Sequence, residues 1–260
     1  MLDLGIQGRR AIVCGSSRGL GRACAEALAR AGVVVVVNGI DADRVARAAA
    51  EIAAATGGQT TAVAADVTTR EGQERLFAAE PSPDILVTNA GGPPVKDFRE
   101  LDRAAILAGV SANMITPIEL IQRAVDGMVA RGFGRIVNIT SISVKMPIPG
   151  LDLSSGARAG LTSFLAGVLR TVAHANVTVN NLLPGFIATD RYRGALDATA
   201  KAQGIAPAAL EAKRIEGIPA RRIGSAAEFG AACAFLCSAP AGYITGQNIL
   251  VDGGMHNSAF

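Results

Sequence analysis

The sequence predicts an α/β fold: a single doubly wound domain whose seven-stranded parallel sheet has helices on both faces. Short apolar runs alternate with longer Ala-rich segments from end to end, which is typical of parallel strands joined by crossover helices. Runs such as VVVVV at 33–37 and RIVNI at 135–139 show little apolar/polar alternation, as expected where both sheet faces are covered. No linker or internal repeat divides the chain, so we expect residues 1–260 to form one domain.

Each element follows from one of these segments. Several expected helices begin after an Asp, Ser or Thr, the residues preferred at a helix N-cap. The apolar runs predict strands at 10–14, 33–38, 59–64, 84–88, 134–140, 176–183 and 248–251. The segments between them predict helices at 19–31, 41–56, 69–79, 101–131, 154–175 and 226–238.

Composition excludes several classes of protein. Half of the residues are hydrophobic and 18% are charged, unlike a disordered chain. The net charge of +3 is too small and too dispersed for nucleic-acid binding, and no apolar run approaches membrane-spanning length. The N-terminal residues resemble neither a signal peptide nor a presequence, so we expect a cytoplasmic protein without a membrane partner. The four cysteines lack CxxC spacing, and Cys233 and Cys237 are expected on one buried helix face, with no metal site.

Two segments interrupt the alternation of strands and helices. Residues 143–153 form a loop with Pro and Gly after the fifth strand, and residues 191–222 form a polar, Ala-rich insertion after the sixth. Ligands of open parallel sheets bind outside the carboxyl ends of the strands, where both segments fall. We therefore expect the 191–222 insertion to be a substrate lid.

A glycine loop joins the first strand to the first helix. In the segment GSSRGLG (15–21), Gly15 and Gly19 allow a tight turn close to a pyrophosphate, and Gly21 allows close packing of the helix. The helix N-terminus that follows offers free N–H groups to phosphate. An ordinary Gly-rich strand–helix turn is the alternative, but the strand–turn–helix context favours a nucleotide site.

Further short motifs follow in order along the chain. The Gly-x3-Gly-x-Gly spacing and these motifs together resemble the short-chain dehydrogenase/reductase family over almost the full length. The motifs are Asp66-Val67, Asn89-Ala90-Gly91, Asn113, Ser141 at the end of IVNITS, Pro184-Gly185 with Thr189, and Gly246 with Val251-Asp252-Gly253-Gly254.

This resemblance implies a Rossmann-like fold and hydride transfer with a nicotinamide cofactor. Asp66 would contact the adenine, and the Asn-Ala-Gly turn would lie behind the adenosine ribose. Asn113 would kink the fourth helix and act in catalysis with Ser141. Residues implied to bind the cofactor are Gly15, Ser17, Arg18, Gly19, Leu20, Gly21, Asn38, Asp66, Val67, Asn89, Ala90, Gly91, Arg158, Pro184, Gly185, Ile187 and Thr189.

The end of the second strand indicates which nicotinamide cofactor is preferred. An NAD-binding fold of this kind places an acidic residue there for the ribose hydroxyls, but this chain has Gly39. Arg18 in the glycine loop is suited to a 2′-phosphate, whereas Asp41 would favour NAD if a small shift brought it to the ribose. We expect NADP(H) to be favoured over NAD(H).

The family's catalytic Tyr and Lys are replaced in this chain. Thirteen residues after Ser141 stands Ser154, and four further stands Arg158, followed by a family-like AGLTSF segment. A phenol, with a pKa near ~10, is tuned by a neighbouring ammonium, whereas a serine hydroxyl is a far weaker acid. Arg158 retains a cation that would reach the nicotinamide ribose hydroxyls. Ser154 would hold a substrate oxygen or a water.

No other residue is an obvious substitute for the missing acid. Tyr192 would have to move in with the lid, and Lys145 and Asp152 lie on the loop between Ser141 and Ser154. The residues that we do not expect to act in catalysis are Tyr243, His174 and His256.

Two functional hypotheses follow. The first is an NADP(H)-dependent oxidoreductase that transfers hydride between nicotinamide and a carbonyl or alcohol substrate, of 3-oxoacyl type or another small ketone. The second is a nucleotide-binding protein of the same fold with a non-redox role, lyase-like or regulatory. In both cases we expect a homotetramer or homodimer formed through the helices at 101–131 and 154–175.

Overall fold

The computed structural model describes residues 3–93 and 95–258, and it confirms the seven predicted strands to within a residue or two. All neighbouring strands of the main sheet are parallel, in the order β3-β2-β1-β4-β5-β6-β9. The chain reverses its direction of winding between β1 and β4, which defines the doubly wound fold. The strands are β1 (Arg10–Val13), β2 (Val34–Gly39), β3 (Thr60–Ala64), β4 (Ile85–Thr88), β5 (Gly134–Ile139), β6 (Val177–Pro184) and β9 (Asn248–Val251).

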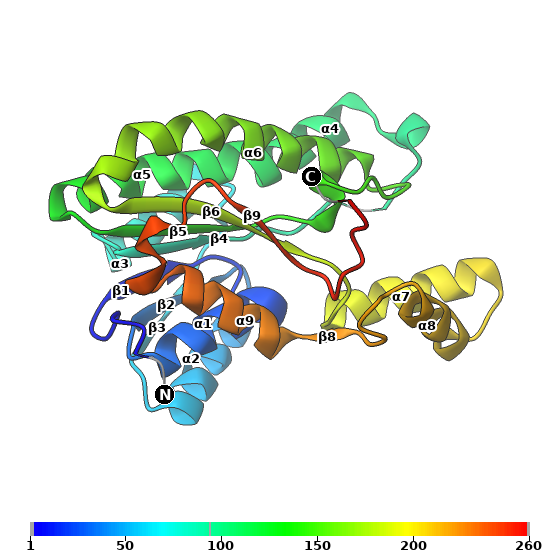
Figure 1. Ribbon diagram of the computed structural model, residues 1–260, viewed down its shortest axis with the longest axis horizontal. Helices are drawn as coiled ribbons and strands as arrows, with labels where there is room; N and C mark the ends of the chain where they lie inside the picture. The colour runs from blue at the N-terminus through cyan, green and yellow to red at the C-terminus, as the bar shows by residue number, and fades with distance from the viewer. Residues whose placement is uncertain (1–2, 94, 259–260) are drawn as a thin grey trace.

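Helices cover both faces of this sheet (Figure 1). One face packs against α1 (Gly19–Arg30), α2 (Ala42–Thr56) and α9 (Ala226–Leu236). The other packs against α3 (Arg70–Ala79), α5 (Thr116–Arg131) and α6 (Asp152–Val172). Consecutive strand residues enter opposite cores: Ile12 joins the cluster with α5 and α6, and Val13 the cluster with α1 and α9. This explains the unbroken apolar runs.

The long fourth helix differs from its prediction. It begins at α4 (Arg103–Val110), where the Asp102 carboxylate caps the helix by accepting a hydrogen bond from the Ala105 N–H at 2.7 Å. A π-helical turn, η2 (Ser111–Ile115), then separates α4 from α5. Single π turns inside helices are frequent at functional sites. The short helical turns elsewhere are η1 (Phe98–Glu100), η3 (Ile142–Val144), η4 (Ala173–Ala175) and η5 (Pro240–Tyr243).

The predicted lid is a helical hairpin that the sequence did not predict as such. It consists of α7 (Asp190–Gln203) and α8 (Pro207–Glu216), and it projects beyond the end of the sheet (Figure 1). Two short parallel strands, β7 (Ile187–Ala188) and β8 (Gly224–Ser225), flank the hairpin. The two helices of the hairpin bury a small apolar core of their own, which includes Tyr192, Leu196, Ala200 and Leu210.

One helix among the described residues is long and apolar enough to cross a membrane by length and composition alone. It is the continuous helix Arg103–Arg131, with a mean hydropathy of 1.6 in its most apolar window, of which 33% is buried. Leu120, Ala124 and Met128 pack it on the sheet as a core helix. All four cysteines are buried free thiols, and Cys233 and Cys237 lie together at the end of α9, as predicted. No cluster of metal ligands occurs in the described parts of the chain.

Candidate active site

The glycine loop after β1 has the backbone that its sequence predicts. Gly15 and Gly19 adopt positive φ angles of 56° and 59°, which L side chains rarely adopt. A side chain at Gly21 would collide with the carbonyl of Gly15, so only glycine lets α1 approach the turn this closely. Helix α1 starts at Gly19, and its N-cap residue, Arg18, makes no capping bond with its side chain. The first N–H groups of α1 are therefore available to a phosphate.

Two asparagines hold this loop in place. The Asn38 side chain accepts from the Gly15 N–H at 3.2 Å and donates to the carbonyls of Val63 and Ala65 at 3.1 and 3.0 Å. Asn89 donates to the Gly15 carbonyl at 3.2 Å. Both N–H groups of the buried Asn38 amide are committed to backbone carbonyls, so Asn38 positions the loop.

The end of β2 carries a glycine, an acid and a nearby arginine. The Ser17 hydroxyl lies 2.9 Å from where a Gly39 Cβ would stand, so this space is already filled. The Asp41 carboxylate caps α2 by accepting from the Arg44 N–H at 2.9 Å, and this bond holds the pKa of Asp41 below its usual value. Arg18 is exposed, and its side chain makes no ion pair or hydrogen bond within the described residues. The Asp41 carboxylate is thus engaged with Arg44, whereas the Arg18 guanidinium is available to a ligand.

The segment after β6 lies next to the glycine loop. The Gly185 N–H donates to the Val251 carbonyl at 3.0 Å, which anchors the segment to β9. The Thr189 hydroxyl caps α7 by accepting from the Tyr192 N–H at 3.2 Å, and its Cγ2 lies 3.8 Å from an ideal Gly19 Cβ. The segments 15–21 and 184–189, which carry expected cofactor contacts, therefore lie side by side. Ile187, within this segment, is buried in β7. The expected adenine contacts Asp66 and Val67 follow β3.

Asn113 stands in the π-helical turn and ties the helix to the loop after β4. Its amide nitrogen donates to the carbonyl of Gly109 at 3.2 Å and contacts that of Gly91 at 3.5 Å. Its buried Oδ1 has no hydrogen-bond partner among the described residues. Asn113 therefore links the Asn-Ala-Gly turn to its own helix. Its Oδ1 remains an unsatisfied hydrogen-bond acceptor.

Ser141 stands at the end of β5 as the N-cap of η3. Its Oγ accepts a hydrogen bond from the Ser143 N–H at 3.1 Å. The hydroxyl proton of Ser141 is not used in that bond. Ser141 therefore retains a donor for a ligand oxygen.

Ser154 and Arg158 lie one helical turn apart on α6 and contact each other. The Arg158 Nε–H donates to the Ser154 Oγ at 3.2 Å, and Nη1 donates to the Ile139 carbonyl at 2.7 Å. Both side chains are largely buried, with 6% of Ser154 and 8% of Arg158 exposed. Burial, assisted by the nearby Arg191 charge, lowers the pKa of Arg158 to about 10, so it remains a cation at neutral pH. Ser154 accepts from this cation and keeps its own proton as a donor.

The residues considered as substitute acids are placed elsewhere. Tyr192 packs inside the lid, 5.8 Å from the Phe186 ring between centroids and with the Arg214 guanidinium over its face. Burial raises the pKa of Tyr192. Lys145 and Asp152 are exposed at the two ends of the 145–152 loop, and the Tyr243 side chain on η5 is fully exposed. In the described part of the chain, none of them makes a side-chain hydrogen bond or ion pair with Ser154 or Arg158.

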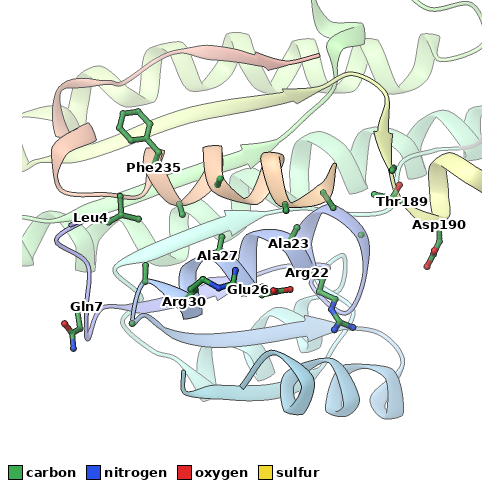
Figure 2. A pocket seen from close by; sticks show the side chains of 18 of the residues that line it. Leu4, Gln7, Arg22, Ala23, Glu26, Ala27, Arg30, Thr189, Asp190 and Phe235 are labelled. Atoms are coloured by element: carbon green, nitrogen blue, oxygen red, sulfur yellow. Dashed lines mark hydrogen bonds and ion pairs between the residues drawn. The ribbon is translucent and has the colours of Figure 1, made fainter. Parts of the chain in front are cut away.

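A separate groove of about 950 Å³ lies along α1 and α9 (Figure 2). Its wall combines alanines of both helices with Arg22, Arg30 and Glu26 of α1. Arg30 is paired with Glu26 at 2.7 Å, and Arg22 with Glu51 at 2.7 Å. The groove is lined by Gly19 and Thr189, two of the expected cofactor contacts, but by none of the candidate catalytic residues.

The fold and the cleft together define a dinucleotide-binding oxidoreductase fold with its site at the carboxyl ends of the strands. The chain belongs to the short-chain dehydrogenase/reductase family, since the family model described as Enoyl-(Acyl carrier protein) reductase matches residues 15–256. It is 33% identical over 258 residues to the 3-oxoacyl-[acyl-carrier-protein] reductase FabG of Aquifex aeolicus, covering 98% of this chain and 100% of that protein. It is also 33% identical to the NADPH-dependent reductase BacG of Bacillus subtilis, over 96% and 98% of the two chains.

Solved structures show the same fold. The chain superposes on L-sorbose reductase from Gluconobacter frateurii, crystallised with NADPH and L-sorbose, with a TM-score of 0.92. The two are 30% identical over 99% of this chain and 100% of that one. The family and the fold expected from the motifs are therefore confirmed. These relatives are short-chain oxidoreductases, so this chain is a nicotinamide-dependent enzyme of that class.

Proposed function

We propose that this protein is an NADP(H)-dependent oxidoreductase acting on a carbonyl or alcohol substrate of 3-oxoacyl type or on another small ketone. The observation that supports this proposal most directly is the pair of hydrogen bonds that Arg158 donates. One goes to Ser154 and the other to the carbonyl of Ile139, two residues before Ser141. This contact brings the two candidate catalytic positions of α6 to the end of β5, the strand that Ser141 follows. The names of the relatives, which are reductases of oxoacyl and sugar ketones, support the substrate class.

The residues of the site would polarise a carbonyl oxygen. The cofactor, when bound, supplies or accepts the hydride at the carbonyl carbon. Ser141 and Ser154 would each donate an O–H to the substrate oxygen, and the Arg158 cation would strengthen the Ser154 donor. Asn113 would hold the loop after β4 against the cleft. Because a serine hydroxyl is a weak acid, the proton that completes reduction would come from water bound at Ser154.

Cofactor selectivity would rest on Arg18. Its unpaired guanidinium stands at the N-cap of α1, close to the end of β2, where Gly39 and Ser17 leave no acid for ribose hydroxyls. Asp41 is engaged as the cap of α2. These contacts support NADP(H) over NAD(H). The remaining contacts proposed above, at 15–21, 66–67, 89–91 and 184–189, would hold the rest of the dinucleotide.

The 191–222 hairpin would serve as the substrate lid of the single domain. Its helices carry their own apolar core, and two short strands connect it to the rest of the domain. Such a unit is able to move as a body over the cleft. Four buried free thiols support the proposed cytoplasmic location, where thiols stay reduced.

The protein is expected to form a homotetramer or homodimer through the long helices. Ile106, Leu107 and Ile115 on the 103–131 helix and Phe164 on α6 are exposed apolar residues. Light scattering should give four times or twice the chain mass of 26.5 kDa. Changing Ile115 and Phe164 together to Lys should split the assembly, whereas Ile40→Lys, on an exposed apolar residue after β2, should not. A native monomer at micromolar concentration would contradict the proposal.

Native turnover tests the proposed reaction. Purified protein mixed with NADPH and a panel of small ketones and 3-oxoacyl thioesters should consume NADPH and form alcohol in equal amounts. Ser141→Ala should lower kcat by about 10²-fold, as for loss of one oxyanion donor. Ser155→Ala, which removes a hydroxyl bonded only to the Leu151 carbonyl, is the matched control. If no substrate is reduced, the Ser/Arg replacement would favour the non-redox alternative.

A further inference from the structure

The side chain of Phe186 connects the segment after β6 to the core of the hairpin. Phe186 stands within the 184–189 segment, and it packs against the apolar core that α7 and α8 bury. Its ring centroid lies 5.8 Å from that of Tyr192 on α7, with 55° between the ring planes. Tilted ring pairs at this separation attract each other. Phe186 is therefore bound to the hairpin by a specific side-chain contact.

The guanidinium of Arg214, on α8, lies over both of these rings. Its Cζ is 5.0 Å from the centroid of Phe186 and 5.5 Å from that of Tyr192. Both distances are within the range of cation–π attraction. Arg214 forms no ion pair within the described residues, so the two rings are the partners of this cation. The three side chains form one stack, which joins α7, α8 and the 184–189 segment.

The backbone of the 184–189 segment is bound to both ends of the hairpin. The Gly224 N–H, after the hairpin, donates to the Phe186 carbonyl at 3.0 Å. The Thr189 hydroxyl, at the start of the hairpin, accepts from the Tyr192 N–H at 3.2 Å. A displacement of the hairpin therefore either moves Phe186 and its neighbours or breaks the stack.

The 184–189 segment begins at the half of the sheet where the reaction would take place. It follows β6, which pairs with β5, the strand that Ser141 follows. The ribose end of the cofactor is expected at Gly39, at the end of β2, and both β1 and β4 lie between β2 and β5. The expected cofactor contacts of this segment therefore begin on the nicotinamide side.

We propose that Phe186 and Arg214 are positioning residues, whose stack transmits the position of the hairpin to the 184–189 segment. Closure of the hairpin and binding of the nicotinamide half of the cofactor would then favour each other. This inference rests on the proposed function, in which 184–189 contacts the cofactor and 191–222 is the lid. Because such coupling is reciprocal, both the affinity for the cofactor and the protection of the hairpin report it.

Two ligands that differ in the nicotinamide half test the first of these effects. Calorimetric titration compares NADP⁺ with adenosine 2′,5′-bisphosphate, which lacks that half. Arg214→Gln should weaken binding of NADP⁺ by about fivefold and leave the Kd of the bisphosphate within about twofold. Arg214→Lys keeps a cation and should restore most of the affinity. Lys213→Gln removes the same charge from an exposed neighbour that has no partner within the described residues, and should change neither Kd.

A second variant tests the stack from its other side. Phe186→Leu keeps an apolar side chain at the hairpin core but removes the ring. It should weaken NADP⁺ binding as Arg214→Gln does, and combining the two changes should cause little further loss, because both break the same stack. Equal weakening of NADP⁺ and the bisphosphate, no change in either, or additive losses in the double variant would overturn the proposal.

Amide hydrogen exchange of the hairpin measures the reciprocal effect. Saturating NADP⁺ should slow exchange in α7 and α8 by at least about fivefold in the native protein, and by less than about twofold in saturated Arg214→Gln. Neither measurement requires a ketone. If both patterns appear without turnover of any ketone, the coupling stands and the reductase function fails. Ketone turnover without protection of the hairpin would have the opposite meaning.

Discussion

Replacing Ser154 with Tyr and Arg158 with Lys together is expected to raise the turnover of ketone reduction at least about tenfold. A positioned general acid typically contributes about 10²–10⁴-fold, and the native pair contains none. A phenol at position 154 would supply the proton directly, and an ammonium at 158 would lower its pKa from near ~10. Steady-state kinetics with NADPH and a ketone that the native enzyme reduces slowly is the measurement.

The single variants separate this explanation from a change in folding or cofactor binding. Ser154→Tyr alone should gain less, because the Arg158 guanidinium is committed to the Ile139 carbonyl and its charge is delocalised. Ser154→Ala should leave the Kd of NADPH nearly unchanged, since no expected cofactor contact is lost. Rapid native turnover that survives Ser154→Ala, with no gain in the double variant, would show that another group such as Lys145 is the acid.

Arg18→Ala is expected to weaken NADPH binding by about 10- to 100-fold and to leave NADH binding within about twofold. A charge-assisted bond to the 2′-phosphate is worth about 1.5–3 kcal/mol, and NADH has no phosphate at that position. Arg18 is exposed and unpaired within the described residues, so its removal disturbs no internal contact. Calorimetric titration of both cofactors measures the change.

Two control variants define what Arg18 does. Arg22→Ala removes a nearby arginine that is already paired with Glu51, and it should leave both affinities nearly unchanged. Asp41→Asn keeps the α2 cap, because Asn is an equally good N-cap residue, but removes the charge. A loss of NADH affinity in Asp41→Asn, with no effect of Arg18→Ala, would show that Asp41 governs the ribose end.

Local sequence was enough to predict the sheet and the glycine loop. Strands buried on both faces are mostly apolar, as in 33–37, so their locations follow from composition. Gly15 and Gly19 could be predicted because the turn needs positive φ angles, which other residues rarely adopt. Gly21 could be predicted because a side chain there would prevent the close approach of the helix to the turn. The replacement of the family's Tyr and Lys by Ser154 and Arg158 stays a prediction from the sequence, made by counting residues from Ser141.

Long-range contacts decided the rest. The Asn38 side chain bonds three backbone groups, at Gly15, Val63 and Ala65. The long insertion 191–222 forms a hairpin with its own core, and the Arg191 guanidinium lies against Gly92, 99 positions away. No local pattern contains this information, because a polar side chain binds whichever group the fold brings within reach. The same holds for the hydrogen bond from Arg158 to the Ile139 carbonyl. Sequence spacing determines which residues share a helix face, but only packing determines which groups that face contacts.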